Sequence, residues 1–443
     1  MSRVSRVVLL LLLVSAADAP AQTSAPSSAP SRADRDTGST EERLRRLEAE
    51  LRELRSRLSA PASAPAPNAT SPTSSAQQAT TRPTGAVQLS ISGYVELYYQ
   101  WSFNDPSNGI TNYRAFDNRH NALTVSNAVL DATAAVGPIS TRVALQVGQT
   151  PETYYLAEPS SPGTSGAGST GPGLWKHIQQ AIAAWRAPLG RGLLVEGGIF
   201  LSPIGPESMP IKDQWNWSRS GLFFALPAYH TGLRVSYPVT DRITLTLGGY
   251  NGWNSVVDNN SEKSIGAQLS YNLTDKLTWQ LLYFTGVERP GGSAEGRCWR
   301  HLFDAYLFWY PTPRLSLLVH GDAGFERTAF GTSWWSAGAL YGRAKIQPWL
   351  YLAARGDLFR EGVASSTGGS ASPIFWPASW VASGTATVDV RPHENVSFRL
   401  EYRHDHAGSA MYFRNDVGKD PSGAFLANAT YQDTLTLGMV AWF

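Results

Sequence analysis

Residues whose types and spacing could support chemistry are few in this chain of 443 residues. His404 and His406 lie two residues apart, so a strand would place both imidazoles on one face and Asp405 on the other. Two imidazoles can bind a metal ion, but no third ligand is evident nearby, and we interpret the two as an interfacial pair. The sequence has no Gly-rich phosphate loop, His-Glu-x-x-His helix or Gly-x-Ser-x-Gly elbow. We therefore predict no enzyme activity, no catalytic residues, no metal site and no cofactor.

The composition indicates strands and turns rather than helices. The chain has 15 Trp, 18 Tyr, 16 Phe and 40 Gly, and charged residues make up 16% of it, against about 25% in an average soluble protein. With 37 basic and 35 acidic residues, the net charge of +2 gives no surface for nucleic acid. No stretch of about 20 apolar residues exists, which excludes a helical transporter. The single cysteine, Cys298, excludes internal disulfides and a Cys-based metal site.

The first 86 residues are predicted to be targeting and linker segments. Two arginines, an apolar run at 7–14 and small residues up to Ala21 predict a secretory signal peptide over 1–21, cleaved after Ala17 or Ala21. Residues 22–38 and the Pro, Ala, Ser and Thr-rich stretch 59–86 are predicted to be disordered linkers. Between them, residues 39–58 carry leucines at spacings of 3 and 4, which predicts a short periplasmic coiled coil: Leu44, Leu47, Leu51, Leu54 and Leu58. A lone amphipathic helix is the alternative.

From residue 88 onward, the dominant hydrophobic period is two. Phe398, Leu400 and Tyr402, for example, alternate with charged residues on the opposite face of the same segment. About sixteen segments have this pattern, although eighteen strands stay open because two connections are long enough to hide a hairpin. Short connections rich in Pro, Gly, Asn and Asp alternate with longer polar ones at 104–121, 150–175, 202–228, 253–262, 289–300, 326–332, 361–379 and 407–430.

This sorting of connections predicts a closed antiparallel transmembrane β-barrel over residues 87–443, with the long loops on one rim. Lipid cannot satisfy free backbone groups, so the sheet must close, and the polar faces must point into the lumen. The predicted lumen charges are of both signs, and passage of solutes is the expected role of so wide an interior. They are Glu96, Asp131, Arg142, Glu196, Arg234, Asp304, Asp322, Arg343, Lys345, Arg355, Asp357, Asp389, Arg399, Glu401, Arg403 and Asp405.

Several motifs resemble those of the β-barrel porin type 2 family of bacterial outer-membrane porins. The run 198–207 (GIFLSPIGPE) is similar to a family motif in which Gly-x-Phe is followed by Ser/Thr-Pro and Gly-x-Glu, and the likeness continues through 216–220, 227–232, 235–238 and 251–254. The resemblance implies an outer-membrane barrel with channel activity and no assigned substrate. A heptad segment before a barrel also resembles phosphate- and carbohydrate-selective porins, which implies a homotrimer.

In general porins the loop between the fifth and sixth strands folds into the lumen and narrows it. The resemblance therefore assigns six residues of 202–228 to a pore constriction: Glu207, Lys212, Asp213, Trp215, Trp217 and Arg219. The two tryptophans could form a stacking surface for sugars; the alternative is an outer loop that they anchor to the rim. The terminal Phe443 is similar to the C-terminal signal read by the outer-membrane assembly machinery, although Ala441 departs from the usual aromatic residue.

The sequence thus predicts a Gram-negative outer-membrane porin that passes small hydrophilic solutes and ions by passive diffusion. The expected partners are outer-membrane lipids, the barrel assembly machinery and two further copies of the chain, with no nucleic acid. Only six lysines occur and the lumen mixes acids with arginines, so weak selectivity is expected. Two alternatives stay open, a sugar- or anion-specific porin and a non-conducting barrel with an adhesive or structural role.

Overall fold

A computed structural model describes residues 85–156, 158, 171–258, 260–365 and 372–443. The predicted signal peptide and coiled coil, and nearly all of the two linkers, fall on residues 1–84 and lie outside the described residues. These assignments therefore stay predictions.

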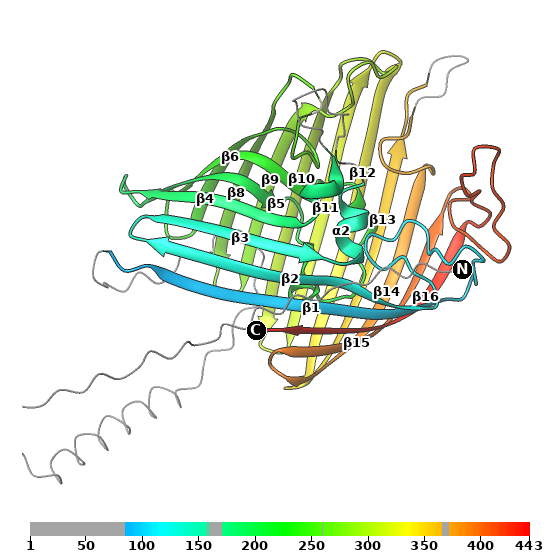
Figure 1. The fold of residues 1–443 in the computed structure, drawn as a ribbon, viewed down its shortest axis with the longest axis horizontal. Coiled ribbons are helices and arrows are strands. Elements are labelled where there is room, and N and C mark those ends of the chain that lie inside the picture. The colour runs from blue at the N-terminus through cyan, green and yellow to red at the C-terminus, as the bar shows by residue number, and fades with distance from the viewer. Residues whose placement is uncertain (1–84, 157, 159–170, 259, 366–371) are drawn as a thin grey trace, which may run out of the picture. The chain divides into compact units, whose positions relative to one another are not determined.

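In the described part of the chain, sixteen antiparallel strands close into a single barrel (Figure 1). Each strand pairs with its neighbours in sequence, and β1 pairs with β16 to close the ring. The prediction of a closed barrel of sixteen strands is confirmed. The strands are β1 (Gln88–Ser102), β2 (Ala122–Val136), β3 (Ile139–Val147), β4 (Ile178–Ala187), β5 (Leu193–Leu201), β6 (Tyr229–Pro238), β7 (Ile243–Tyr250), β8 (Ser264–Thr274), β9 (Leu277–Val287), β10 (Trp299–Thr312), β11 (Leu315–Thr328), β12 (Gly331–Gln347), β13 (Leu350–Gly362), β14 (Trp380–His393), β15 (Val396–Ala407) and β16 (Tyr431–Trp442).

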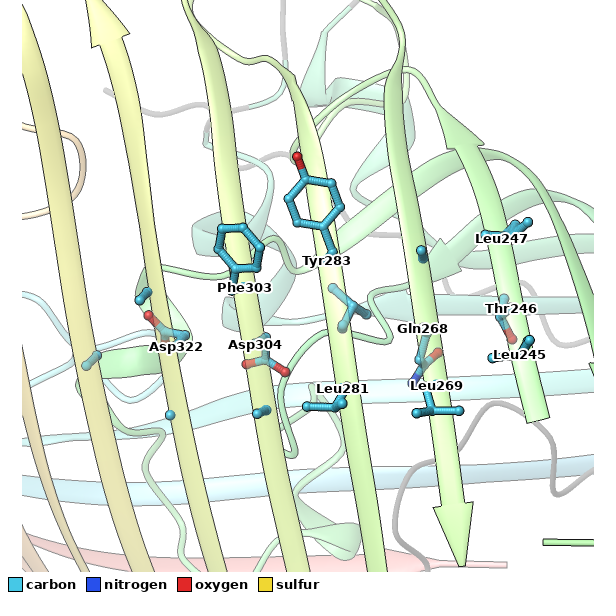
Figure 2. A pocket seen from close by; sticks show the side chains of 16 residues that line it. Leu245, Thr246, Leu247, Gln268, Leu269, Leu281, Tyr283, Phe303, Asp304 and Asp322 are labelled. Atoms are coloured by element: carbon cyan, nitrogen blue, oxygen red, sulfur yellow. The ribbon is translucent and has the colours of Figure 1, made fainter. Parts of the chain in front are cut away.

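The two faces of the strands differ in polarity. In β15, Arg399 and Glu401 are buried, whereas Leu400 between them is 46% exposed. Apolar side chains face outward because lipid solvates them, and the charged ones face the interior, where they find partners. Over β7–β12 the barrel wall forms an apolar groove of about 640 Å³, lined by residues that include the outward side chains Leu245, Leu269, Leu281 and Phe303 (Figure 2).

Short connections lie at one end of the barrel and long ones at the other, except that one connection predicted to be long is short. The turns after β2, β8, β10, β12 and β14 leave only two residues outside the strands, and Gly137 in the first of them adopts a φ of +55°. The exception is 326–332, predicted as a long polar connection. There β11 continues to Thr328 and β12 begins at Gly331, because Glu326 is a fully buried strand residue that pairs with Arg300 and Arg289. The charge of Glu326, which indicated a loop, lies on the inner face of the barrel.

The long loops pack into the barrel. They contain the short helices α2 (Gln149–Tyr154), α3 (Pro172–Trp175) and α4 (Gly221–Phe224) and the 3₁₀ turn η2 (Ile211–Asp213). Trp376 and Met411 from two loops share one buried apolar cluster with the inward side chains Phe284, Trp335 and Phe359. None of the helices in the described residues is long and apolar enough to cross a membrane.

Candidate functional site

The connection 202–228 leaves β5 and returns to β6, as predicted, and crosses the interior of the barrel. Prolines at 203, 206 and 210 keep the chain from continuing a strand, and Ser220 caps α4 by accepting a hydrogen bond from the Phe223 N–H at 3.3 Å. The loop contacts β13–β15, which lie about eight strands away from β5 and β6 in the ring of sixteen. We call residues 202–228 the crossing loop.

Charged side chains of the far wall hold the backbone of the crossing loop. Glu401 accepts hydrogen bonds from the N–H groups of Trp217 at 2.5 Å and Ser218 at 2.9 Å. Arg399 donates to the Asn216 carbonyl at 3.0 Å. Arg403 donates to the carbonyl of Arg219. Arg355 donates to the carbonyl of Ser218 at 2.6 Å. Asp357 accepts a hydrogen bond from the Gly221 N–H at 2.8 Å. Five of the predicted lumen charges therefore bind main-chain groups of one short segment.

Two more carboxylates hold the backbone of the crossing loop. Glu207, in the crossing loop itself, accepts the Ser220 N–H at 3.0 Å and pairs with Arg355 at 3.1 Å. Glu96 on β1 accepts the Ile211 N–H at 2.6 Å. The crossing loop is thus bonded to β1 at η2, and to β13 and β15 between η2 and the start of α4.

The two tryptophans of the crossing loop are packed against the wall. Trp215 is 8% exposed, with its ring centroid 6.1 Å from that of Phe308. Trp217 is 1% exposed and lies 6.2 Å from the Tyr98 ring. It also covers Gly438 of β16, where a Cβ atom would come within 2.2 Å of the indole. Neither indole presents a free face to a solute in this conformation.

Arg219 is buried and bound by the crossing loop itself. Its guanidinium donates to the carbonyls of Ser208 at 3.0 Å, Trp217 at 2.8 Å and Met209. The same group lies 5.1 Å above the Phe116 ring, which comes from the loop between β1 and β2. Arg219 therefore braces the fold of the crossing loop.

A polar cavity of about 510 Å³ opens at the short-turn end of the barrel, and Lys212 and Asp213 contribute to its lining. We call it the vestibule. Three acids and three bases line it as ion pairs: Arg142 with Asp131 at 2.5 Å, Arg234 with Glu196 at 2.7 Å, and Lys212 with Asp213 at 2.9 Å. The Lys212 side chain is 30% exposed and that of Asp213 is 22% exposed. Of the six residues predicted for a constriction, these two line the open space and the other four pack against protein.

Several of the remaining predicted lumen charges have charged or aromatic partners elsewhere on the inner face. Arg343 lies 3.6 Å from Asp389 and stacks over the Tyr351 ring at 4.1 Å. Lys345 lies 5.9 Å from the same ring. Asp405 pairs with Arg403 at 2.6 Å and with Arg114 at 3.3 Å. Sequence reasoning missed Arg114, because it lies in an irregular loop where no period indicates which way a side chain points.

The histidine pair lies on the outer face of β15, near the loop end of the strand. The His404 ring lies 6.1 Å from that of His406 and is held by Asp433 at 2.8 Å, while His406 packs against Trp380 at 5.3 Å. Phe443 exchanges backbone hydrogen bonds with Gly93 of β1 and is 69% exposed. The side chain thus stands at the outer surface of the seam where the barrel closes.

Glu158 ties two of the long loops together at the long-loop end of the barrel. Its carboxylate accepts hydrogen bonds from the Tyr229 hydroxyl at 2.6 Å and from the backbone N–H groups of Val256 and Val257 at 3.0 to 3.1 Å. Burial raises the pKa of this carboxyl, an effect that the hydrogen bonds partly oppose. Glu158 therefore ties the loop after β3 to the loop between β7 and β8.

The comparisons with known proteins agree on one class of barrel. The sequence model of the family described as "Putative beta-barrel porin-2, OmpL-like" matches residues 88–443. An anion-selective porin from Comamonas acidovorans has a similar structure, with 11% identity, a TM-score of 0.53 and coverage of 81% of this chain and 100% of that one. The in-vitro folded outer membrane protein OmpT of Vibrio cholerae, in its trimer form, matches with 9% identity, a TM-score of 0.50 and coverage of 81% and 100%. At these identities the likeness shows the fold alone. Among curated proteins, none matches the chain.

Proposed function

The chain belongs to the Putative beta-barrel porin-2, OmpL-like family, and on that premise we propose that it is an outer-membrane porin whose narrow lumen passes small hydrophilic solutes and ions by passive diffusion. The observation that carries this proposal is the vestibule, a polar cavity of about 510 Å³ inside a closed barrel. Every lining charge has a partner of opposite sign there. A balanced lining focuses no strong field of either sign, so the expected ion selectivity is weak.

The crossing loop is the proposed constriction. Lys212 and Asp213 are the side chains that a passing ion would meet, since both lie on the open side of the loop. Glu207, Trp215, Trp217 and Arg219 keep the loop in place by the contacts described above. In this proposal the crossing loop sets the width of the aperture. Because the loop is hydrogen-bonded to the wall, the aperture keeps the same width as solutes pass.

A second candidate function is a barrel that does not conduct and serves in adhesion or as a structural element. The apolar cluster of Trp376, Met411, Phe284, Trp335 and Phe359 favours it, because that part of the interior is packed rather than hydrated. The cluster lies toward the long-loop end, and the proposed solute path passes beside it.

Conductance of the purified, heat-modifiable protein in a planar bilayer separates these candidates. Under a KCl gradient, the porin should give discrete steps with a small reversal potential. Steps that a sugar or phosphate blocks would indicate a substrate-specific porin. Silence from protein that shows the gel shift of a folded barrel would reject the channel and leave the non-conducting role.

Location and partners follow from the same proposal. We infer that the barrel lies in the outer membrane of a Gram-negative bacterium with its short turns and N-terminal segment in the periplasm, surrounded by outer-membrane lipids. Phe443 would be recognised by the assembly machinery, and the chain would form a homotrimer.

A further inference from the structure

Three titratable side chains meet on the inner face of β10 and β11, away from the vestibule. Asp304 of β10 stands directly opposite Asp322 of β11 in the antiparallel register, and Figure 2 shows the two side by side on neighbouring strands. His320 lies two residues before Asp322, so it shares the same face. All three are at least 96% buried, and their ligand atoms lie within 4.8 Å of one another.

The hydrogen bonds of this cluster are incomplete. His320 Nε2 lies 2.6 Å from an oxygen of Asp304, the other oxygen of Asp304 accepts the Gly205 N–H at 3.2 Å, and the Trp335 indole donates to one oxygen of Asp322 at 3.1 Å. The second oxygen of Asp322 and the Nδ1 of His320 have no partner. A buried polar atom without a partner costs about 1–3 kcal/mol, so the cluster as it stands carries two such costs.

The charge of the cluster is also uncompensated by the surrounding protein. Among the described residues, no lysine or arginine forms an ion pair with Asp304 or Asp322, in contrast to Asp357, Asp389 and Asp405, which pair with arginines. Two carboxylates directly opposite each other on paired strands repel, and one protonated imidazole neutralises only half of their charge. A divalent cation would neutralise both.

We propose that Asp304, His320 and Asp322 bind one divalent cation of the Zn²⁺ class. Two carboxylate oxygens and an imidazole nitrogen form a ligand set that Zn²⁺ accepts readily. A cation centred between atoms that are at most 4.8 Å apart lies within about 2.8 Å of each, so movements of under about 1 Å give Zn–ligand bonds of roughly 2.0–2.2 Å. The Asp322 oxygen that lacks a hydrogen bond supplies a free lone pair. The Nε2 of His320, which lies beside Asp304, would exchange its hydrogen bond for the ion, with the proton of the neutral imidazole on Nδ1.

The position of this site links it to the crossing loop. Gly205 donates its N–H to Asp304, and a Cβ atom on Gly205 would come within 3.4 Å of the His320 ring. The ion would therefore fix the start of the crossing loop to β10 and β11, on the wall that the arginines and Glu401 do not reach. The site is thus structural and does not depend on whether the barrel conducts.

The test is retention of metal by the refolded chain without a histidine tag. The protein is refolded in detergent with one equivalent of ZnCl₂, desalted, and its zinc content measured by mass spectrometry; we expect about one ion per barrel. Asp322→Asn keeps an acceptor for the Trp335 indole but removes the ligand charge, and should lower the affinity at least about tenfold, in the range seen when a metal site is disturbed. Cobalt loading should give a visible ligand-field absorption in the wild type only.

Two controls keep this test decisive. The double variant His404→Gln, His406→Gln removes the exposed histidine pair and should retain the ion, whereas loss of zinc in that variant would assign the binding to the rim. Asp131→Asn removes a lumen carboxylate that pairs with Arg142 and should also have no effect. The heat-dependent gel shift shows that each variant is folded. Equal zinc content in the wild type and Asp322→Asn, or none in either, would overturn the proposal.

Discussion

The charged residues of this lumen have two different roles, and the groups that each residue contacts show which role it has. Glu401 and Arg399 are buried and bound to backbone groups of the crossing loop, so their charges serve as strong hydrogen-bond partners. Lys212 and Asp213 border the vestibule and are partly hydrated. A charge can influence a passing ion only when water or the ion can approach it, so selectivity belongs to the second group.

Lys212→Glu should make the channel cation-selective. The change leaves two acids next to each other at the vestibule and should raise the ratio of potassium to chloride permeability by roughly twofold or more. The reversal potential in a KCl gradient measures it. Lys276→Glu, the same change on the exposed turn between β8 and β9, is the matched control. Equal reversal potentials for the two variants would remove the crossing loop from the ion path.

Glu401→Gln should loosen the crossing loop. The amide offers one acceptor oxygen where the carboxylate satisfies two N–H groups, so one buried donor loses its partner at a cost of about 1–3 kcal/mol. Denaturant unfolding of the detergent-solubilised barrel gives this difference. Glu394→Gln, on the exposed turn between β14 and β15, should leave the free energy of unfolding unchanged. A Glu401→Gln barrel as stable as the wild type would contradict the anchoring role.

At the scale of elements, the barrel and the crossing loop were predictable to different degrees. Period-two alternation predicted the strands, and the ends of 202–228 agree with the structure because prolines and polar residues interrupt that period. The same criterion failed at 326–332, where a buried Glu326 looked like a loop residue. The anchors of the crossing loop could not be predicted, because their partners are separated by up to 184 residues and no local pattern pairs them.

Gly438→Ala should displace the crossing loop from β16. The new methyl group would come within 2.2 Å of the Trp217 indole, so the ring must move, at a cost of about 1–3 kcal/mol for overpacking. The temperature of the heat-dependent gel shift should fall. Gly384→Ala adds the same methyl group on the outer face of β14, where nothing lies within 4 Å, and should have no such effect. Equal transition temperatures for the two variants would mean that the Trp217 indole does not pack closely against Gly438.

At the scale of the whole molecule, the resemblance noted in residues 198–254 is confirmed by the family match over residues 88–443. The apolar outer face and the sorted loops were sufficient to predict a membrane barrel. The packed interior was not predictable, because it depends on loops whose side chains find partners only in three dimensions. The proposed trimer is a property of the same scale, to which the heptads at 39–58 would contribute.

Native mass spectrometry of the full chain in mild detergent should give three times the mass of one chain. Leu47→Glu with Leu51→Glu places charges in the predicted seam and should reduce the trimer fraction, since short coiled coils depend on their apolar positions. Ala49→Glu, outside the seam, should not change it. Monomers alone in the wild type would reject the trimer, and trimers in all three proteins would assign assembly to the barrel.

The opposing anchors of the crossing loop also determine when it can form during biogenesis. Glu401 and the Ser218 N–H that it binds are separated by 183 residues, and the partner strand is the last but one of the barrel. Contacts between such distant parts of a chain form late, because the intervening segment must first be ordered. The crossing loop therefore docks onto a nearly complete wall. An assembly intermediate that lacks β13–β15 would hold an undocked loop accessible to proteases. The moment at which the loop becomes resistant to proteolysis would mark the end of barrel assembly.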